Sequence, residues 1–480
     1  MAQVIVPHAG ARFGRAAVML PLLFTGACAS VPHLAASPAP HAASDYHASA
    51  SLAGTQEQWP ADGWWANYRD PQLTRLMDEA LSGSPDLAAA SARMRTAQGY
   101  TMAAGAALKP AVDAMGSVNE AKFSKNQPVP AAFIPGGWND SGSLGLGLNL
   151  DLDLWGKNRA ALRAARLDSK AVELEFAEAR LGLTTGIAST YAQMAALYAQ
   201  RDNLEDALDI RTQTLSLVRQ RVEAGLDNES ALRQAEARLP QTRAALLATD
   251  EAIELAKNAL AALVGAGPDR ALTIGRPTVA LSSLQGLPSS ASINLVGRRP
   301  DVAAARARLE AAAERIKVAR AAFYPDVSIQ ALAGLQSFGL SNLFTGNSFA
   351  GSVGPAVSLP LFHGGALQGQ YRARRGEYDE LVAHYDQQVV QALHETADAV
   401  TSRKMLVQRL SEEREALSKY ESAHRLAQLR YQQGLSTYLE VLTAEEGVVA
   451  ARLKVADLET RTFTLDVQLI RALGGGFASA

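Results

Sequence analysis

The chain has 480 residues, of which 48% are hydrophobic and 20% are charged, and its formal net charge is −2 at pH 7. A chain of this length can bury a large core. A charge so close to zero gives no electrostatic basis for binding nucleic acid, and no cluster of Lys and Arg with interleaved aromatic residues occurs. We therefore expect no nucleic-acid partner.

The N-terminal segment predicts export from the cytoplasm. Arg12 and Arg15 precede an apolar run from Ala16 to Phe24, and small residues follow, which is the pattern of a signal peptide over residues 1–27. The run is too short to cross a bilayer as a helix, which needs about 20 apolar residues. No later segment reaches that length, so any later crossing would have to be made by β-strands.

Cys28 is the single cysteine of the sequence, so no internal disulfide can form. It follows small residues, as the lipid-accepting cysteine of bacterial lipoproteins does, and we expect it to carry lipid such as palmitate. Thr25 stands where that signal usually has an aliphatic residue, and ordinary cleavage around Ala27 would remove the cysteine instead. Ala29, which is not Asp, favours the outer membrane by the same resemblance.

Residues 28–58 are rich in Ala, Ser, Pro and His. This composition predicts a flexible tether without a core of its own. His33, His41 and His47 lie in this segment, and we interpret them as tether residues and not as metal ligands.

The rest of the chain contains a repeat. Seven residues between Pro85 and Arg93 recur in the same order between Pro300 and Arg308. A period this long exceeds that of a solenoid and indicates one duplicated unit. We predict a first repeat at 59–275, a linker at 276–298 and a second repeat at 299–476.

Each repeat is predicted to begin with helix and to continue as a β-hairpin. Pro85 to Leu108 has proline at the first helical position, and Pro300 to Phe323 is its counterpart. The pattern then changes to period two, which predicts β-hairpins at 111–154 and 326–362.

The second strand of the first hairpin, from Ser143 to Leu154, has the sharpest alternation. Leucine occupies every second position, and Gly, Ser, Asn and Asp occupy the others. A soluble sheet with one buried face gives the same pattern. The strand length suits a membrane strand, however, and no other sheet is predicted that could cover the leucines. We therefore predict that the following residues face lipid: Leu144, Leu146, Leu148, Leu150 and Leu152.

Four strands cannot close a membrane barrel, and an open edge in lipid leaves backbone groups without hydrogen bonds. The chain is therefore expected to form oligomers. Two copies would give a narrow barrel and three copies a wider one, and strand number alone does not decide between them.

A long helical hairpin is predicted after each β-hairpin, at 157–265 and at 365–473. Each one turns at a glycine, Gly225 or Gly434, that is placed for a left-handed helix cap. Taken alone, these segments also fit a solvated coiled-coil scaffold without a pore.

Motifs of catalysis are missing from the sequence. There is no nucleotide phosphate loop and no assembled serine nucleophile motif. His394 and Glu395 begin a zinc-site pattern, but Asp398 stands where the second histidine is needed. We predict that the protein is not an enzyme and needs neither a metal nor a cofactor.

Several short motifs, spread over nearly all of the predicted mature chain, resemble one known family. They are Gly63-Trp64-Trp65, Arg298-Arg299-Pro300-Asp301, Ala319 to Pro325, Ser358 to Phe362, and Ala472 to Gly476. Together they resemble the TolC-like outer-membrane efflux factors, and within these the NodT-type efflux lipoproteins.

This resemblance implies a mainly α fold with a small β part. Three chains would form one α-barrel of long coiled-coil-like helices and one 12-stranded membrane β-barrel. The trimer would be lipid-anchored in the outer membrane, with its helices in the periplasm, and would pass small toxic compounds outward passively. A periplasmic adaptor protein and an inner-membrane transporter would be its partners. Alternatives are a type I protein-secretion or metal-efflux duct of the same fold, or a periplasmic coiled-coil scaffold.

The resemblance also implies two groups of site residues at the helix tips. Leu439, Glu440 and Tyr431 would belong to the periplasmic gate, although Thr443 replaces an acid that is often found there. The residues expected to contact the adaptor are Arg221, Gly225, Leu226, Arg430, Gly434 and Leu435.

Overall fold

The chain is mainly helical and contains one four-stranded antiparallel sheet, as the sequence predicted. It divides into two compact units. The computed structural model describes residues 30–53, 58–126, 128, 130–279, 288, 295 and 297–477. The predicted signal peptide and Cys28 lie outside these residues.

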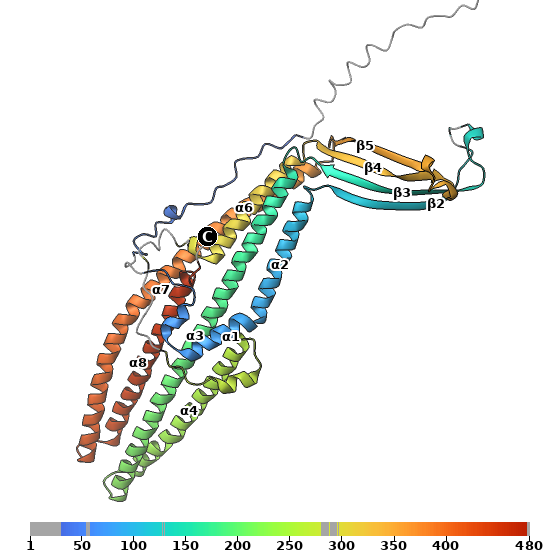
Figure 1. Ribbon diagram of the computed structural model, residues 1–480. Helices are drawn as coiled ribbons and strands as arrows, with labels where there is room; N and C mark the ends of the chain where they lie inside the picture. Colours follow the sequence, from blue (N-terminus) through green and yellow to red (C-terminus); the bar gives the residue numbers. More distant parts are fainter. Residues whose placement is uncertain are drawn as a thin grey trace, which may run out of the picture. The chain divides into compact units, whose positions relative to one another are not determined.

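The first unit contains the sheet, and its residues come mainly from 95–170 and 307–384. The strand order is β2-β3-β4-β5, so the hairpins of the two sequence halves lie side by side (Figure 1). The strands are β2 (Ala111–Lys122), β3 (Trp138–Asp151), β4 (Asp326–Phe338) and β5 (Phe349–Ser358).

Every pair of neighbouring strands is antiparallel. Leu144 of β3 lies opposite Gly116 of β2 on one side and opposite Leu335 of β4 on the other. Because side chains alternate between the two faces of a strand, residues joined by this register share one face across the whole sheet. The register therefore decides which side chains form a common surface.

Three strand boundaries differ from the sequence prediction. β3 ends at Asp151, before the predicted end at Leu154, so Leu152 and Leu154 lie beyond the strand. β3 begins at Trp138, before the predicted start at Ser143, because its first residues pair with the end of β2. β5 ends at Ser358, so Leu359 and Leu361 lie in the connection that follows the strand. Its last residue, Ser358, lies opposite Asp326, the first residue of β4, so the strand ends where its partner begins.

The helices repeat their lengths in the two sequence halves. α3 and α7 have 67 residues each, and α4 and α8 have 35 residues each. The helices are α1 (Pro71–Gly83), α2 (Pro85–Ala106), α3 (Lys157–Glu223), α4 (Glu229–Leu263), α6 (Pro300–Ala321), α7 (Ala366–Gln432) and α8 (Tyr438–Ala472). Among the described residues, none of these helices is both long and apolar enough to cross a membrane.

The second unit is helical and includes α1, α4, α8 and most of α3 and α7. Its main core lies where α1 and the preceding turn pack against α3, α4 and α8. Large side chains from all of these elements are buried there, including Trp64, Leu73, Tyr191, Leu260 and Ile470.

A buried carboxylate ties α1 to this core. Asp70 is the N-cap of α1 and accepts hydrogen bonds from the N–H of Gln72 at 2.8 Å and of Leu73 at 3.2 Å. It also accepts bonds from the hydroxyl of Tyr191 and the N–H of Thr278, both at 2.8 Å. Burial by itself raises the pKa of Asp70, but these hydrogen bonds outweigh it, so the pKa lies below its ordinary value.

The described part of the predicted tether makes contacts with α7 that its composition did not suggest. In the first unit, Arg375 Nη2 donates a 2.6 Å hydrogen bond to the carbonyl of Ala35. In the second unit, the Tyr46 hydroxyl and the His41 N–H donate to Asp386 Oδ1 at 3.1 and 3.0 Å. Burial and this carboxylate raise the pKa of Tyr46 to about 12. This stretch of the tether is therefore held on the helix.

Candidate functional site

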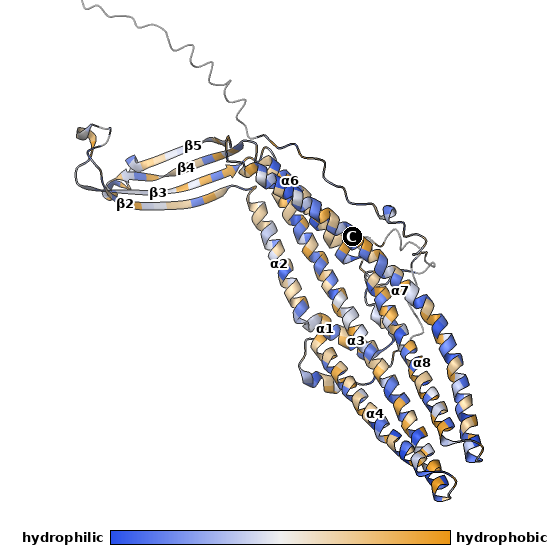
Figure 2. Ribbon diagram, turned by 180° about the vertical axis from the view of Figure 1, so that it is seen from behind, coloured by the Kyte–Doolittle hydropathy of each residue, from blue (hydrophilic) through white to orange (hydrophobic). Residues whose placement is uncertain are grey.

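One face of the sheet is apolar across all four strands. Its side chains are exposed or half-buried in the single chain, and the exposed fraction is 48% for Leu144, 56% for Leu146 and 79% for Val353. The hydropathy of the strands can be followed in Figure 2. By register, this face carries Val112, Ala114 and Val118 of β2, Leu144 to Leu150 of β3 at alternate positions, Val327 to Leu335 of β4 likewise, and Val353 and Val357 of β5.

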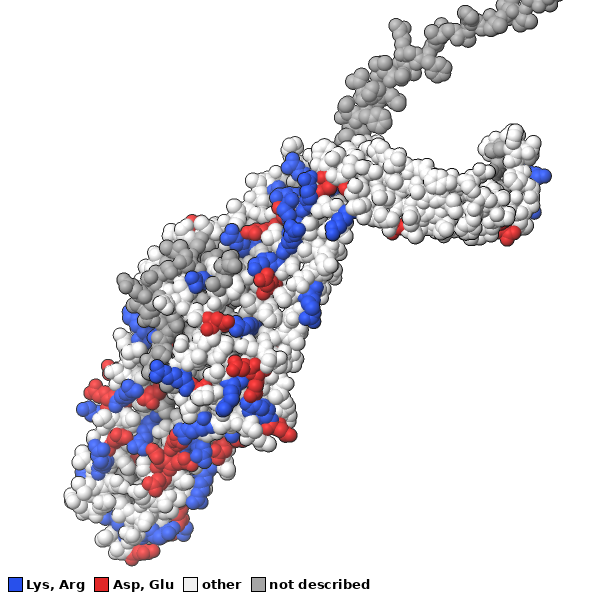
Figure 3. All heavy atoms as spheres, viewed as in Figure 1, with Lys and Arg blue, Asp and Glu red and all other residues white. Residues whose placement is uncertain are grey.

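The opposite face carries mainly polar residues and glycine. Ser117 and Ser143 share a 2.8 Å hydrogen bond there, and Asn149 and Gln330 lie opposite each other on β3 and β4. Charged side chains are concentrated over the helices, and the visible surface of the strands has few of them (Figure 3). The sheet is thus amphipathic from one edge to the other.

The sheet is open at both edges. Within the described residues, β2 pairs with β3 and β5 pairs with β4, and neither has a second neighbour. Each outer edge therefore presents backbone N–H and C=O groups that can pair with another strand.

The two long helical hairpins of the second unit turn through matching glycines, as the sequence predicted. Gly225 has φ +68° and Gly434 has φ +77°, a region that disfavours residues with a Cβ. The next residue, Leu226 or Leu435, donates its N–H at 2.8 Å to the arginine carbonyl five positions back. Both leucine side chains are about two-thirds exposed, at 64% and 65%.

Arg221 and Arg430 each stabilise the turn that follows their own helix. Arg221 Nη2 donates to the carbonyl of Leu226, and Arg430 Nη2 donates to that of Leu435, both at 3.4 Å. Arg221 also lies over the ring of Tyr431, 4.6 Å from its centroid. This contact links the end of α3 with the end of α7.

Tyr431 joins the two tips through a partly buried hydrogen bond. Its side chain is fully buried, and its hydroxyl donates to Asp227 Oδ2 at 2.6 Å. Burial and the nearby carboxylate raise the pKa of the Tyr431 hydroxyl, so it remains protonated and can keep donating. A tip cluster surrounds it, which we define as Val218, Ala231, Ala235, Tyr431, Tyr438, Val441 and Leu442.

The structure places the three predicted gate residues in two different environments. Leu439 is 64% exposed and Glu440 is also exposed, and both lie in the first turn of α8. Tyr431 is packed inside the tip cluster. Within a single chain, the structure therefore separates Tyr431 from the exposed pair.

Sequence reasoning missed two residues of this region. Asp227 accepts the hydrogen bond of the Tyr431 hydroxyl and lies just after the first turn. Ser436 occupies the matching position after the second turn, so the sequence repeat gave no signal for Asp227. Glu445 of α8 is buried and paired with Arg211 of α3. A charged residue at a buried position of a predicted helix face is the signal that could have identified it.

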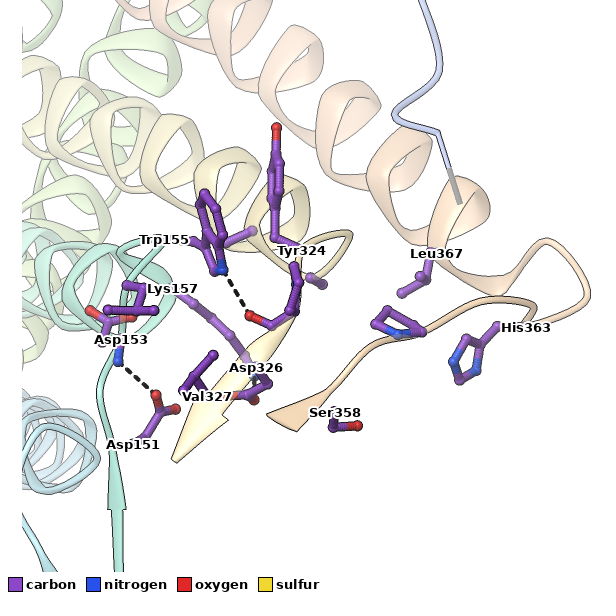
Figure 4. A pocket seen from close by; sticks show the side chains of 15 residues that line it. Asp151, Asp153, Trp155, Lys157, Tyr324, Asp326, Val327, Ser358, His363 and Leu367 are labelled. Atoms are coloured by element: carbon purple, nitrogen blue, oxygen red, sulfur yellow. Dashed lines mark hydrogen bonds and ion pairs between the residues drawn. The ribbon is translucent and has the colours of Figure 1, made fainter. Parts of the chain in front are cut away.

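A pocket of about 280 Å³ lies in the first unit, where strands connect to helices (Figure 4). Trp155 stacks on Tyr324 with ring centroids 4.8 Å apart, and its indole donates to the carbonyl of Pro325 at 2.7 Å. Asp153 accepts the N–H of Asn158 at 2.8 Å at the start of α3. The pocket side chains therefore stabilise the connection between the strands and the helices. Among the residues that the structure describes, no cluster of His, Cys, Asp and Glu could hold a metal ion.

The family model described as outer membrane efflux protein matches residues 76–266 and 293–475. The chain belongs to the outer membrane efflux protein family. It is 33% identical over 434 residues to the multidrug resistance outer membrane protein MdtP of Shigella flexneri, covering 88% of each chain. It is 28% identical to the toluene efflux pump outer membrane protein TtgI of Pseudomonas putida, covering 96% of this chain and 98% of TtgI.

A solved structure agrees with this assignment. The crystal structure of the outer membrane protein VceC from Vibrio cholerae superimposes with a TM-score of 0.84 and 45% identity, covering 87% of this chain and all of VceC. This efflux protein is thus a transport channel of the outer membrane and not an enzyme. The TolC-like resemblance is confirmed, while the NodT subtype and the lipid anchor stay predictions.

Proposed function

We propose that three copies of the chain form one duct, in which the apolar sheet face meets lipid and the polar face lines a wet passage. The observation that carries this proposal is the continuous apolar face, which includes four of the five leucines predicted to face lipid: Leu144, Leu146, Leu148 and Leu150. The fifth, Leu152, follows the end of β3. Exposed apolar side chains in such a continuous surface are unfavourable in water and favourable in hydrocarbon.

The open edges support the oligomer. In a bilayer, unpaired backbone groups cost several kcal/mol each, so β5 of one chain must pair with β2 of the next. Three sheets of four strands then close into twelve strands, enough for an interior passage.

We further propose that the cargo is small toxic organic compounds and that the duct passes them without an energy source of its own. The names of relatives support this, since MdtP is a multidrug resistance protein and TtgI belongs to a toluene efflux pump. An inner-membrane transporter would supply the energy and a periplasmic adaptor would connect the two. Ducts for protein secretion or metal efflux remain the alternatives within the same fold.

The exposed tips suit the adaptor contact. Leu226 and Leu435 project apolar side chains at the two matching turns, with Arg221 and Arg430 beside them. In this proposal, Leu439 and Glu440 face the passage of the trimer, and Tyr431 keeps the two tips of one chain together.

Two other assignments belong to the proposal. Matched helix lengths and the recurring order of helix, β-hairpin and helical hairpin support duplicated repeats at 59–275 and 299–476, joined by the linker 276–298. A lipid on Cys28 would fix the start of the tether, 28–58, to the membrane.

Fractionation and a deletion strain test the proposal together. We expect the protein in the outer-membrane fraction as a trimer that dissociates on heating, and we expect the deletion strain to become sensitive to organic toxic compounds. Recovery as a soluble periplasmic protein would instead favour the scaffold alternative. Unchanged drug sensitivity with a defect in protein secretion or metal tolerance would identify one of the other ducts.

A further inference from the structure

Two apolar side chains lie on the polar face of the sheet, near the middle of its strands. Met115 of β2 lies opposite Gly145 of β3. Leu332 of β4 lies opposite Gly147, the next residue of β3 on that face. The two side chains are 52% and 43% exposed. They form an apolar interruption in a surface that otherwise carries mainly polar residues and glycine.

Both side chains lean over β3, from opposite sides. A Cβ placed on Gly147 would come within 2.6 Å of Met115 Cε, and a Cβ on Gly145 would come within 3.7 Å of Leu332 Cδ1. The glycines of β3 therefore leave the space that these two side chains occupy. Together they form one surface, which we call the apolar shelf and define as Met115, Leu332, Gly145, Gly147 and Gly334.

Gly334 keeps the apolar shelf flat on the side of β4. It lies opposite Gly145, and a Cβ on Gly334 would come within 2.5 Å of Gly145 Cα. Any other residue would force the two strands apart, because carbon atoms do not approach so closely. The row that begins at Met115 therefore continues without a side chain across β3 and β4, so a flat molecule can approach the shelf closely.

A carboxylate borders the apolar shelf. Asp113 precedes Met115 by two residues on β2, so it shares the same face and lies roughly 7 Å away along the strand. Its side chain is exposed, and it has no hydrogen-bond or ion-pair partner among the residues that the structure describes. A negative charge beside an uncharged apolar surface is complementary to a molecule that carries a positive charge on an apolar ring.

We propose that the apolar shelf and Asp113 form a binding subsite for aromatic cations. The ring rests on Leu332 and on the thioether of Met115, because sulfur makes favourable contacts with aromatic rings. The cationic group lies beside the carboxylate of Asp113. This inference rests on the proposed function as a duct, and it narrows the cargo to organic compounds that combine a ring with a positive charge.

The open position of the subsite agrees with passage through a duct. A compound must bind well enough to enter and weakly enough to leave. Met115, Leu332 and Asp113 are all partly or fully exposed in the single chain, so they offer one face of contact and do not enclose the compound. Three chains supply three such subsites at one level of the passage.

Protection of a cysteine beside the apolar shelf tests the proposal. Ser143→Cys places a thiol on β3 two residues from Gly145, and iodoacetamide alkylates thiolates that water can reach. The rate is measured on the purified full-length protein at constant ionic strength, and the wild type, whose single cysteine is Cys28, gives the background. We expect millimolar benzyltrimethylammonium to slow alkylation several-fold. Tetramethylammonium, which lacks the ring, and benzoate, which has the opposite charge, should leave the rate unchanged.

Further variants in the Ser143→Cys background identify the residues of the subsite. Asp113→Asn removes the charge and Leu332→Ser removes the apolar side chain, so either change should abolish the protection. Glu120→Gln removes an exposed carboxylate from the opposite face of β2 and is the matched control, which should keep the protection. If Leu332→Ser does not assemble, Met115→Gln keeps the length of the side chain and must abolish the protection in its place.

Two more cysteines separate failure of the subsite from failure of the duct. Asn119→Cys lies on the polar face about 13 Å along β2 from Met115 and should react without protection, and Val118→Cys on the apolar face should not react. Absent protection of Ser143→Cys, equal protection of Asn119→Cys, protection by benzoate or tetramethylammonium, or protection retained in Asp113→Asn would overturn the subsite. A reactive Val118→Cys with an unreactive Asn119→Cys would instead reject the wet passage and thus the duct itself.

Discussion

At the scale of single residues, buried polar groups hold the helical unit together at specific points. Asp70 satisfies the N-terminal N–H groups of α1 and simultaneously binds Tyr191 of α3 and Thr278. Its charge is compensated by five donors, including the Thr278 hydroxyl at 3.3 Å, in a site with little solvent. Such a group contributes more to stability than an exposed helix cap does, because its donors would otherwise be buried without an acceptor.

We predict that Asp70→Ala lowers the free energy of unfolding by about 2 kcal/mol, from the lost cap and the lost bonds to a charged acceptor. Thermal melting of the purified protein is the measurement. Asp62→Ala, at a side chain that is 63% exposed, serves as the control and should melt close to the wild type. A melting point for Asp70→Ala equal to that of the control would contradict the assigned role.

The pKa of Asp70 adds a prediction with a defined sign. Because its pKa is lowered in the folded protein, its contribution is complete above the ordinary Asp pKa of about 3.9 and is lost as the pH falls through the folded-state pKa. The stability difference between wild type and Asp70→Ala should therefore be larger at pH 7 than at strongly acidic pH. Melting curves across this range measure it, and a difference that grows on acidification would have the wrong sign.

Tyr431 provides a test of the link between the tips. Tyr431→Phe keeps the ring in the tip cluster and removes the hydroxyl that donates to Asp227, which is worth about 1.5 to 3 kcal/mol for a charged acceptor. We expect more frequent opening in planar bilayers. Tyr438→Phe, in the same cluster, is the matched control. Equal conductance of the two variants would show that the hydroxyl does not hold the tips.

At the scale of elements, the sheet depends on alternation along each strand. Leu148 and Asn149 are neighbours in β3 but belong to opposite faces. If a strand shifted by one residue against its neighbours, its apolar side chains would move to the polar face and its polar side chains to the apolar face. The function of the sheet therefore depends on its register.

These neighbours make a paired experiment possible. Leu148→Asp should reduce trimer yield in the outer membrane, because a charge on the lipid face costs about 2 kcal/mol in each chain. Asn149→Asp should assemble normally, since its side chain is exposed on the polar face. Heat-modifiable trimer on gels is the readout. Normal assembly of Leu148→Asp, or the reverse order of the two variants, would show that the faces are assigned wrongly.

Local patterns explain which parts of the fold could be predicted. The hairpins and the glycine turns were predictable because period two in Leu144 to Leu150 and the spacing before Gly225 and Gly434 are short-range signals. The Tyr431–Asp227 bond and the Glu445–Arg211 ion pair were not predictable, because they join segments of different sequence halves whose contacts depend on how the two halves pack. The contact of Tyr46 with Asp386 was hidden for the same reason, behind a composition typical of a free tether.

At the scale of the whole molecule, the exposed leucines of the two turns should act together. We predict that Leu226→Ser combined with Leu435→Ser leaves the trimer intact and lowers drug resistance several-fold, because adaptor docking loses two apolar contacts. Leu247→Ser, at a leucine of α4 that is 70% exposed, is the control. Full resistance of the double variant would place the adaptor contact elsewhere.

The pairing of β3 with β4 has a consequence for biogenesis. Ser141 lies opposite Phe338, so the centre of the sheet joins segments almost two hundred positions apart in the chain. Contacts this remote form slowly, because a long loop must close before they are gained. The newly exported chain therefore crosses the aqueous periplasm with apolar strands that have not yet paired. A periplasmic chaperone would be needed to shield these strands until insertion.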